Sequence, residues 1–560
     1  MKKMVLLLFS VALIATAALA QPVLRGQRTY GGSNTDLLYQ MCFSKDGGLV
    51  LAGSSSSGIS GNKTTAGKGS ADYWIIKLGK IGKKKWESTI GGSDSDSLTD
   101  IKATTDGGYI LAGWSISPIS GDKTEGLKGN GGDYWVVKVD KLGNIQWNKT
   151  IGGSEDDDAQ SVIQTADGGY LVAGNSMSGI SGDKTGKNIN GGPFLWNTYD
   201  IWLVKLDKNG NIQWDKTIGG TADEGWIYHI YDPHQGSNRR RLVCKAAPDG
   251  GYVIGTSSNS NISGNKTENS YGGTPDYWVV KTDANGNVLW DKTIGGSGED
   301  YLSALDIATD GSILAGGYSW SDASGDKTQG KRSSDYWIVK LSSAGAILWD
   351  KTIGGGAIDI LQEIQHTSDG GFILAGNSTS GKSYDKTDHH LGENDYWIVK
   401  INSTGAIEWN RTFGGSGNDV PYAVLESKPN VYYIGGYSDS PVSDSKTAGL
   451  HGNPDYWVLK LIYYPATAEV TSDVITGNKL SSNKAANIKS FLVYPNPATT
   501  VLHVQNIGKA TFMLTSQSGK SVLTKTINGS ADINVANLPA GIYYLTNTAT
   551  KVTQKVVITK

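Results

Sequence analysis

Short runs of apolar and β-branched residues, separated by glycine-rich turns, fill most of the chain between residues 30 and 464. One unit, residues 97–151, reads SLTDIKAT, a TDGG turn, YILAGWS, a long polar loop, DYWVVKVD, a KLGN turn and IQWNKTI. Runs of this length bounded by such turns predict four antiparallel strands. In DYWVVKVD, Trp135 and Val137 lie on one face and Tyr134 and Val136 on the other. We therefore expect an apolar layer against each face of the sheet.

This unit occurs seven times. Each copy has a Gly-Gly pair, at Gly31-Gly32, Gly91-Gly92, Gly152-Gly153, Gly219-Gly220, Gly295-Gly296, Gly354-Gly355 and Gly414-Gly415. Each also has an Asp-aromatic-Trp motif or its variant, ending at Trp74, Trp135, Trp202, Trp278, Trp337, Trp397 and Trp457. Five of the six spacings between these tryptophans lie between 59 and 67 residues, and one is 76. Seven four-stranded units predict an all-β fold, a seven-bladed β-propeller of antiparallel blades over residues 21–464.

The two ends of the repeat region distinguish a closed ring from an open solenoid. The last unit stops after its third strand, near Tyr464. A sequence like that of the missing fourth strand is found instead at the N-terminal end of the repeat region, in RGQRTYGG at residues 25–32. In that stretch Thr29 and Tyr30 align with Thr150 and Ile151. A solenoid would need polar caps at both ends, whereas a ring closes when the N-terminal strand completes the last blade. We therefore predict a ring closed by the N-terminal strand.

Each unit also carries a recurring acid and a recurring lysine. The acids, five residues after the first glycine, are Asp36, Asp96, Asp157, Glu224, Asp300, Asp359 and Asp419. The lysines, in the long loops, are Lys63, Lys123, Lys184, Lys266, Lys327, Lys386 and Lys446. Seven acids and seven lysines in equivalent places suggest an ion pair or hydrogen bond that joins neighbouring blades. The Gly-Gly stretch itself is interpreted as the connector between blades, where a side chain would clash.

The first twenty residues have the pattern of a secretory signal peptide. Lys2 and Lys3 precede an apolar stretch, and Ala18-Leu19-Ala20 forms a small-x-small site that predicts cleavage between Ala20 and Gln21. A membrane anchor is the alternative, but the apolar run is short and no other long apolar segment follows. We expect no transmembrane segment in the mature chain.

Composition excludes several classes of function. The 51 basic and 53 acidic residues nearly cancel, so no overall field favours nucleic acid. Two cysteines, Cys42 and Cys244, are too few for a disulfide framework and are expected to be buried. No nucleophile elbow, phosphate-binding loop or dinucleotide fingerprint occurs in its required setting, so we assign no catalytic residue and no cofactor.

After a Ser-, Thr-, Asn- and Lys-rich linker at residues 465–489, the last segment, residues 490–560, reads as short alternating strands of a small β-sandwich. Its motifs are Tyr494-Pro495-Asn496-Pro497, Leu502-His503-Val504, Gly519-Lys520, Leu538-Pro539 with Gly541 and Tyr543, and a terminal Lys555-Val556-Val557. In this order they resemble the type A sorting domain that marks cargo of the type IX secretion system in Bacteroidota. Ser516 and Ser518 depart mildly from that pattern, in which an acid usually precedes the Gly-Lys turn.

The resemblance implies recognition by the type IX secretion machinery. It also implies export to the periplasm, passage across the outer membrane and removal of the domain. The protein would then be secreted or attached to the cell surface.

Two consecutive insertions break the repeat on the face that carries the long loops. The long loop of unit three is widened, and the following connector region is lengthened to GGTADEGWIYHIYDPHQGSNRRRL. Together they supply candidate ligand-binding residues, namely Phe194, Trp196, Tyr199, Trp226, Tyr228, Tyr231, Arg239, Arg240 and Arg241. Exposed aromatic rings stack on sugars or anchor a protein partner, and arginine binds carboxylate or sulfate. The alternative is that the insertions pack their own aromatic side chains over one blade.

Calcium is the metal that the chain could hold. Acids cluster at Glu155-Asp156-Asp157-Asp158, whereas the loop from Asp207 has Ile218 at the twelfth position and fails as an EF-hand. No metal ligand is assigned on this pattern.

Three functions remain open. The first is a surface or secreted binding propeller for a glycan, another envelope component or a surface protein. The second is a structural or adhesive module without a small ligand. The third is a polysaccharide-acting enzyme, which would require a carboxylate pair in the channel that breaks the seven-fold pattern.

Overall fold

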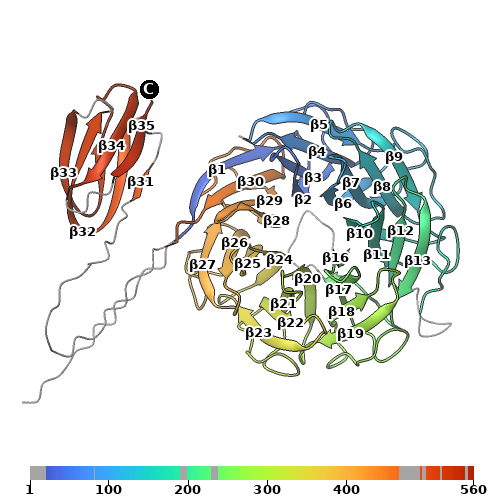
Figure 1. Cartoon of the computed structure of the whole chain (residues 1–560). Coiled ribbons are helices and arrows are strands. Elements are labelled where there is room, and N and C mark those ends of the chain that lie inside the picture. The colour runs from blue at the N-terminus through green and yellow to red at the C-terminus, as the bar shows by residue number, and fades with distance from the viewer. Residues whose placement is uncertain are drawn as a thin grey trace, which may run out of the picture. The chain divides into compact units, whose positions relative to one another are not determined.

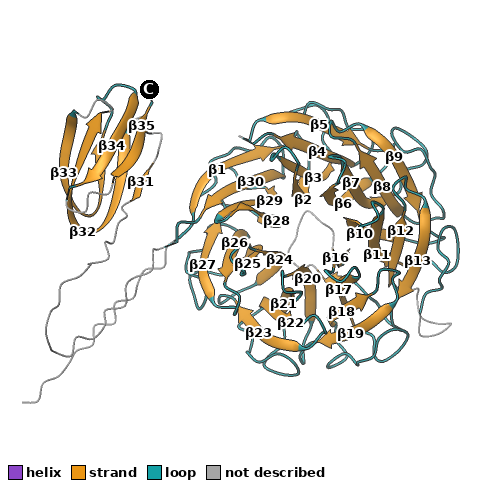
Figure 2. Cartoon of the chain, in the orientation of Figure 1, coloured by secondary structure: helices purple, strands orange, loops and turns teal. Residues whose placement is uncertain are grey.

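The computed structural model describes residues 21–80, 82–189, 198–228, 238–465, 492–494, 498, 500–516, 520–548 and 553–559. The signal peptide and most of the linker predicted above lie outside these residues. The chain divides into two compact units, Met1–Ala468 and Glu469–Lys560. The described parts of both consist of strands and loops (Figure 2). No helix in these ranges is long and apolar enough to cross a membrane.

The first unit is a seven-bladed β-propeller in which every blade is a four-stranded antiparallel sheet (Figure 1). The first three blades are β2–β5 (Asp36–Phe43, Leu49–Ser55, Asp72–Leu78, Lys84–Ile90), β6–β9 (Asp96–Ala103, Tyr109–Ser115, Asp133–Val139, Ile145–Ile151) and β10–β13 (Asp157–Gln164, Tyr170–Ser176, Asp200–Leu206, Ile212–Ile218). The next three are β16–β19 (Val243–Ala246, Tyr252–Ser258, Asp276–Thr282, Val288–Ile294), β20–β23 (Asp300–Ile307, Ile313–Ser319, Asp335–Leu341, Ile347–Ile353) and β24–β27 (Asp359–His366, Phe372–Ser378, Asp395–Ile401, Ile407–Phe413).

Blade seven closes the ring in the way that the sequence predicts. It contains β28 (Asp419–Lys428), β29 (Val431–Ser438) and β30 (Asp455–Ile462), and its fourth strand is β1 (Val23–Tyr30). The antiparallel register of β1 on β30 runs from Val23 opposite Ile462 to Tyr30 opposite Tyr456. Figure 1 shows the two strands side by side although they come from opposite ends of the repeat region.

The third strand of each blade is buried on both faces, as its pattern predicts. In β8, Trp135 and Val137 belong to the apolar cluster shared with blade one, while Tyr134 and Val136 belong to the cluster shared with blade three. The Tyr134 ring lies 5.0 Å from the Trp202 ring of the next blade, and its hydroxyl donates to the Trp202 carbonyl oxygen at 3.2 Å. The contact between the two aromatic rings and this hydrogen bond thus join the third strands of neighbouring blades directly.

Six of the seven seams between blades contain this pair. The others are Tyr73 with Trp135, Tyr277 with Trp337, Tyr336 with Trp397, Tyr396 with Trp457, and Tyr456 with Trp74 across the closing seam. The tyrosine hydroxyl needs a glycine in the second strand of the next blade. A Cβ on Gly174, for example, would lie 2.7 Å from the Tyr134 hydroxyl.

The seam between blades three and four is the exception, and two residues change together there. Ile201 stands where the other blades have tyrosine, and Thr256 stands where blade three has Gly174. Both are fully buried, and the Thr256 hydroxyl donates to the Arg241 carbonyl oxygen at 2.9 Å. The threonine thus occupies space that a tyrosine hydroxyl would need.

The C-terminal unit is a five-stranded antiparallel sheet made of β31 (Leu492–Tyr494), β32 (Val501–Ser516), β33 (Ser521–Asn534), β34 (Gly541–Asn547) and β35 (Thr553–Ile558). The long strand β32 pairs with β33 on one edge, and on the other edge with β31 and then β34. It buries its own apolar cluster, which includes Leu502, Phe512 and Val556. All five strands are therefore joined through β32 rather than divided between two separately paired sheets.

The paired change at the exceptional seam can be tested with a double-mutant cycle. Ile201→Tyr alone should lower the free energy of unfolding by about 1–3 kcal/mol, because Thr256 leaves no room for the hydroxyl. Ile201→Tyr combined with Thr256→Gly should recover most of that loss by rebuilding the contact found at the other seams. Urea unfolding of the mature chain measures both. Equal losses in the single and double variants would contradict the steric explanation.

Candidate functional site

The face with the long loops is held together by the Gly-Gly connectors. In every blade the backbone N–H of the recurring acid donates to a carbonyl oxygen of the preceding blade at 2.7–2.8 Å. Six of the acids also accept from the second glycine of the connector, as Asp157 does from Gly153 at 2.7 Å. A Cβ on Gly152 would lie 1.8 Å from Oδ1 of Asp133. Close approach of a carboxylate therefore requires glycine here, and neither glycine of the pair has a positive φ.

Each connector brings two buried carboxyl groups together, one from the acid and one from the Asp-aromatic-Trp motif of the preceding blade. Asp133 of blade two faces Asp157 of blade three in this way, and one oxygen of each has no hydrogen-bond partner among the described residues. Burial, together with the nearby charge of Asp157, raises the pKa of Asp133 to about 7. Burial likewise raises the pKa of Asp276 to about 8 and that of Asp419 to about 7.

The predicted ion pair between the recurring acids and lysines is wrong. Within the ranges described, no ion pair joins the two sets. Lys63 instead donates to the Thr65 carbonyl oxygen at 2.7 Å and to the Thr89 hydroxyl at 3.0 Å, with its ammonium group 5.6 Å from the centre of the Trp74 ring. The other six lysines lie over the tryptophans of their own blades at 5.4–6.0 Å. Each lysine thus stabilises its own blade through a cation–π contact.

The acidic connector at residues 155–158 makes hydrogen bonds within the protein. Oδ1 of Asp156 accepts from the Gly132 N–H at 2.9 Å, and Oδ2 of Asp157 accepts from Gly153 and from the Ser178 hydroxyl. The described residues contain no group of three or more histidine, cysteine or acidic side chains placed to hold a metal ion. Cys42 and Cys244 are both free and buried, and burial raises the pKa of each thiol to about 12.

The insertion of blade four lies elsewhere than the sequence interpretation placed it. Glu224 keeps the normal connector position, with its N–H bonded to the Tyr199 carbonyl oxygen. The extra residues follow Glu224, and they include the two-stranded hairpin of β14 (Trp226–Tyr228) and β15 (Asn238–Arg240). The chain leaves the inner strand for the hairpin at Gly225 and returns to it at Arg241, and the Arg241 N–H donates to the Gly225 carbonyl oxygen at 3.0 Å. It therefore interrupts the innermost strand of blade four, the strand that lines the channel.

The candidate ligand-binding residues fall into three groups in the structure. Tyr199 is 7 % exposed, and its N–H donates to Asp223. Arg241 points into the channel. For the remaining candidates the described structure contains no side chain, since Phe194, Trp196 and Tyr231 lie outside it and Trp226, Tyr228, Arg239 and Arg240 are described only as strand backbone.

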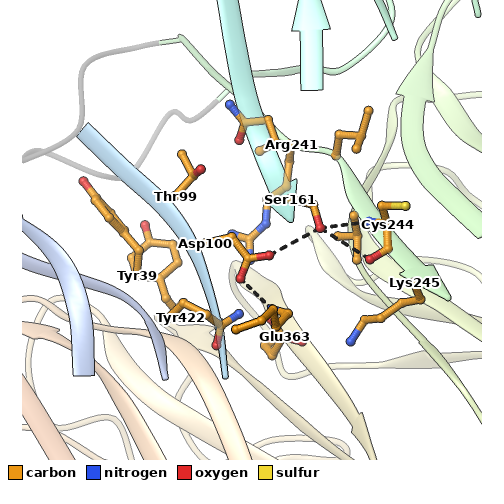
Figure 3. A pocket seen from close by; sticks show the side chains of 14 residues that line it. Tyr39, Thr99, Asp100, Ser161, Arg241, Cys244, Lys245, Glu363 and Tyr422 are labelled. Carbon is orange, nitrogen blue, oxygen red and sulfur yellow. Dashed lines mark hydrogen bonds and ion pairs between the residues drawn. The ribbon is translucent and has the colours of Figure 1, made fainter. Parts of the chain in front are cut away.

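The channel contains a set of charged residues that differ from blade to blade (Figure 3). The Arg241 guanidinium donates to the side chain and carbonyl oxygens of Gln362 in blade six at 2.8 and 2.5 Å, and lies 5.6 Å from the Tyr422 ring of blade seven. Asp100 of blade two pairs with Lys102 at 2.5 Å and accepts from the Val162 N–H of blade three at 2.9 Å. These contacts tie together inner strands from five of the seven blades.

The charges in the channel balance each other. Lys245 of blade four pairs with Asp306 of blade five at 3.2 Å. Burial raises the pKa of Glu363, although the positive charges of Lys245 and Arg241 oppose that change. Three acids, Asp100, Asp306 and Glu363, are thus matched by three cations. The cavity between them measures about 70 Å³, which suits a few water molecules better than a sugar ring.

Apart from Arg241, these channel residues were missed by the sequence interpretation, which compared features shared by the repeats and the two large insertions. The signal that could have found them is a difference between the repeats at equivalent positions. Two inward positions of the first strand hold Asp100 and Lys102 in blade two, but Ala304 and Asp306 in blade five. Acids that break the seven-fold pattern are therefore present in the channel, and each lies close to a cation.

Comparison with known proteins concerns the two units separately. Residues 492–559 match the Secretion system C-terminal sorting domain. The chain ends in a type IX secretion sorting domain. Its match includes every motif residue predicted from the sequence. In the structure Leu538 packs against the domain core, and the Tyr543 hydroxyl donates to the Pro539 carbonyl oxygen at 2.9 Å. Pro495, Asn496, Pro497 and Gly519 lie outside the described residues, and of Tyr494 only the backbone is described.

The chain is similar to the regulatory protein FlaEY of Caulobacter vibrioides, with 24 % identity over 433 residues, which is 70 % of this chain and 41 % of FlaEY. It therefore spans about two-fifths of that relative. Solved structures similar to it include BBS1N in complex with ARL6DN (10 % identity, 80 % of this chain and 99 % of the other, TM-score 0.41). Another is the quinohemoprotein alcohol dehydrogenase ADHIIG of Pseudomonas putida HK5 (10 % identity, 84 % of this chain and 79 % of the other, TM-score 0.35). A third is Drosophila Plexin A in complex with Semaphorin 1b (9 % identity, 80 % of this chain and 88 % of the other, TM-score 0.35).

The sorting domain implies that the protein is secreted or attached to the cell surface, and that it engages the secretion machinery.

The buried carboxyl pairs predict how stability depends on pH. The folded pKa of Asp276, about 8, lies above its ordinary value of 3.8, so its contribution is fully present below about pH 4 and is lost as pH rises through 8. Asp167 behaves oppositely, because its hydrogen bond from Lys205 lowers its pKa to about 2 and its contribution is lost as pH falls below 4. The melting temperature should therefore be highest in mildly acidic solution and decline toward pH 9.

Asp276→Asn should reduce the alkaline part of that decline, because the amide cannot ionise. Asp322→Asn, at an exposed carboxyl on the same face, serves as the control and should leave the profile unchanged. Thermal unfolding between pH 4 and pH 9 measures both variants. A melting temperature that rises steadily up to pH 9 would show that the carboxyl pairs do not govern the profile.

Proposed function

We propose that the protein is a secreted or surface-attached binding propeller that recognises a glycan or another envelope component through the inserted segments of blades three and four. The observation that carries this proposal is the position of the hairpin β14–β15. It interrupts the innermost strand of one blade at the channel, in an otherwise regular ring. Irregular segments on a rigid scaffold are where binding sites are usually built.

The residue types of the insertions support this function. Phe194, Trp196, Trp226, Tyr228 and Tyr231 provide rings that can stack on sugar faces. Arg239 and Arg240 provide paired donors for carboxylate or sulfate groups on an acidic polysaccharide. A ligand held by stacking and paired hydrogen bonds needs no reactive group in the protein. The charge-balanced channel beneath is consistent with a scaffold role.

A structural or adhesive module is the second candidate, and two observations favour it. Tyr199 is buried rather than available to a ligand, and Arg241 is committed to Gln362 across the channel. In that case the insertions would stabilise the propeller and contribute no ligand contact. A polysaccharide-acting enzyme would need one of the channel acids to be reached by substrate, and the small volume of the cavity weighs against it.

Retention of the purified mature chain on insoluble and immobilised polysaccharides tests the proposal. We expect retention on at least one polysaccharide, with a loss of about tenfold or more in the Trp196→Ala/Trp226→Ala variant, because stacking contributes about 0.5–1.5 kcal/mol per ring beyond burial. Trp114→Ala/Trp320→Ala provides the matched control. Like Trp196 and Trp226, these two tryptophans belong neither to the seven Asp-aromatic-Trp motifs nor to the tryptophans that recur in the outer strands of six blades. Equal retention of both variants would place the site elsewhere, and no retention would favour the structural module.

A further inference from the structure

The outer strand of six blades carries a tryptophan at one structural position. It lies opposite the lysine of the third strand, in the pairs Trp86–Lys77, Trp147–Lys138, Trp214–Lys205, Trp290–Lys281, Trp349–Lys340 and Trp409–Lys400. In blade seven the outer strand is β1, and the residue opposite Lys460 is Gly26. The blade that is completed by the N-terminal strand therefore lacks the tryptophan of all the others.

At the other seams this tryptophan covers the edge of the next blade. A Cβ on the turn glycines Gly143, Gly210, Gly286, Gly345 and Gly405 would lie 2.8–3.1 Å from the indole ring of the preceding blade. The sixth indole, of Trp409, lies 5.8 Å from the Tyr432 ring and 5.7 Å from the Tyr463 ring. Each indole thus fills the space between two blades on the rim that carries the short turns.

Among the described residues, which do not include Ile81 of the flanking turn, no side chain fills the seam between blades seven and one at that place. The corresponding turn glycine is Gly82, and the nearest atom to a Cβ built there is Nε of Arg28 at 3.8 Å. A Cβ on Gly26 would meet no atom within 4 Å. The resulting groove has a volume of about 810 Å³, and its apolar floor includes Tyr30, Phe43 and Leu49.

The groove has one sign of charge. The described residues of its lining include Arg25, Arg28, Lys80, Lys428 and Lys460, and none of them is acidic. A second groove of about 750 Å³ continues along β1, shares Arg28 and Gly82 with the first, and adds Lys83 and Lys84, again without an acid among its lining residues. In the part of the chain that the structure describes, Arg28, Lys80 and Lys428 form no ion pair. An otherwise charge-balanced protein thus has a basic groove with an apolar floor.

We propose that this groove binds a tryptophan side chain carried on an acidic peptide segment of a partner protein. The six occupied seams show which ring fits between two blades on this rim, and the basic lining sets the charge of the residues on either side of it. An indole would cover the apolar floor, while neighbouring carboxylates would pair with the lysines and arginines. This interaction is independent of the glycan function proposed for the inserted segments, which lie on another blade.

A short peptide with one tryptophan flanked on both sides by aspartate and glutamate is the probe. We expect it to bind the mature chain with a Kd between about 1 and 100 µM, as measured by fluorescence anisotropy. Because the contacts are partly electrostatic, the affinity should fall as salt increases. Replacement of the tryptophan by alanine, or of the acids by glutamine, should each weaken binding at least about tenfold. Binding that is unaffected by either replacement would overturn the proposal.

Substitution of the groove itself separates specific binding from general attraction. Gly26→Trp restores the residue of the other six blades, so it should abolish peptide binding and raise the melting temperature, whereas Gly26→Ala should change neither. Lys80→Glu/Lys428→Glu should weaken binding at least about tenfold without filling the groove. Lys141→Glu/Lys208→Glu is the matched control, because these exposed lysines occupy the position of Lys80 in the turns of blades two and three.

Three results would contradict the assignment. The first is peptide binding that survives both Gly26→Trp and the Lys80/Lys428 variant. The second is an equal loss in the Lys141/Lys208 control, which would show attraction to basic surface in general. The third is binding of sulfated dextran, but not of the peptide, in a manner blocked by Gly26→Trp, which would assign the groove to an anionic polysaccharide.

Discussion

The contact between a tyrosine of one third strand and the tryptophan of the next is the interaction on which the ring depends. It buries two large rings between adjacent sheets and adds a hydrogen bond to a backbone carbonyl oxygen, so it sets both the spacing and the register of neighbouring blades. The glycine that receives the tyrosine hydroxyl is part of the same arrangement. At the rim, the glycine connectors repeat this principle, because a carboxylate approaches the backbone closely enough to exclude any side chain.

The irregular features of the propeller are concentrated at two seams. Between blades three and four, Ile201 and Thr256 replace the usual tyrosine and glycine, and the hairpin β14–β15 enters the inner strand nearby. Between blades seven and one, Gly26 replaces a tryptophan where the two ends of the ring meet. Apart from the channel positions, where the charged residues differ from blade to blade, the repeat is nearly uniform elsewhere. These two seams are therefore where one copy of the unit differs most from another without disturbing the common core.

Much of this architecture follows from the sequence, since a pattern repeated seven times averages out the ambiguity of any single strand. The strand order, the closing role of residues 25–32 (observed as β1, Val23–Tyr30) and the buried faces around Trp135 were predicted in that way. Contacts between side chains were not. Lys63 stacks on Trp74 rather than pairing with Asp36, because burial of both charged groups is better compensated by separate partners. The channel charges and Gly26 are found when the repeats are compared residue by residue for positions at which one copy differs, a comparison that the search for shared features did not include.

The strand that completes blade seven, β1, is synthesised before the other strands of the propeller, whereas its partner β30 is synthesised after them. The side chains of Arg25 and Tyr464, which are hydrogen-bonded within blade seven, are 439 residues apart, so the pairing of β1 with β30 is among the most non-local events that folding of this chain requires. Until β30 has formed, the segment VLRGQRTY must remain without its partner. Two arginines and a glycine in that segment lower its tendency to pair with other chains. Because Gly26 stands where the other outer strands have tryptophan, β1 also exposes one fewer large apolar ring while it has no partner strand.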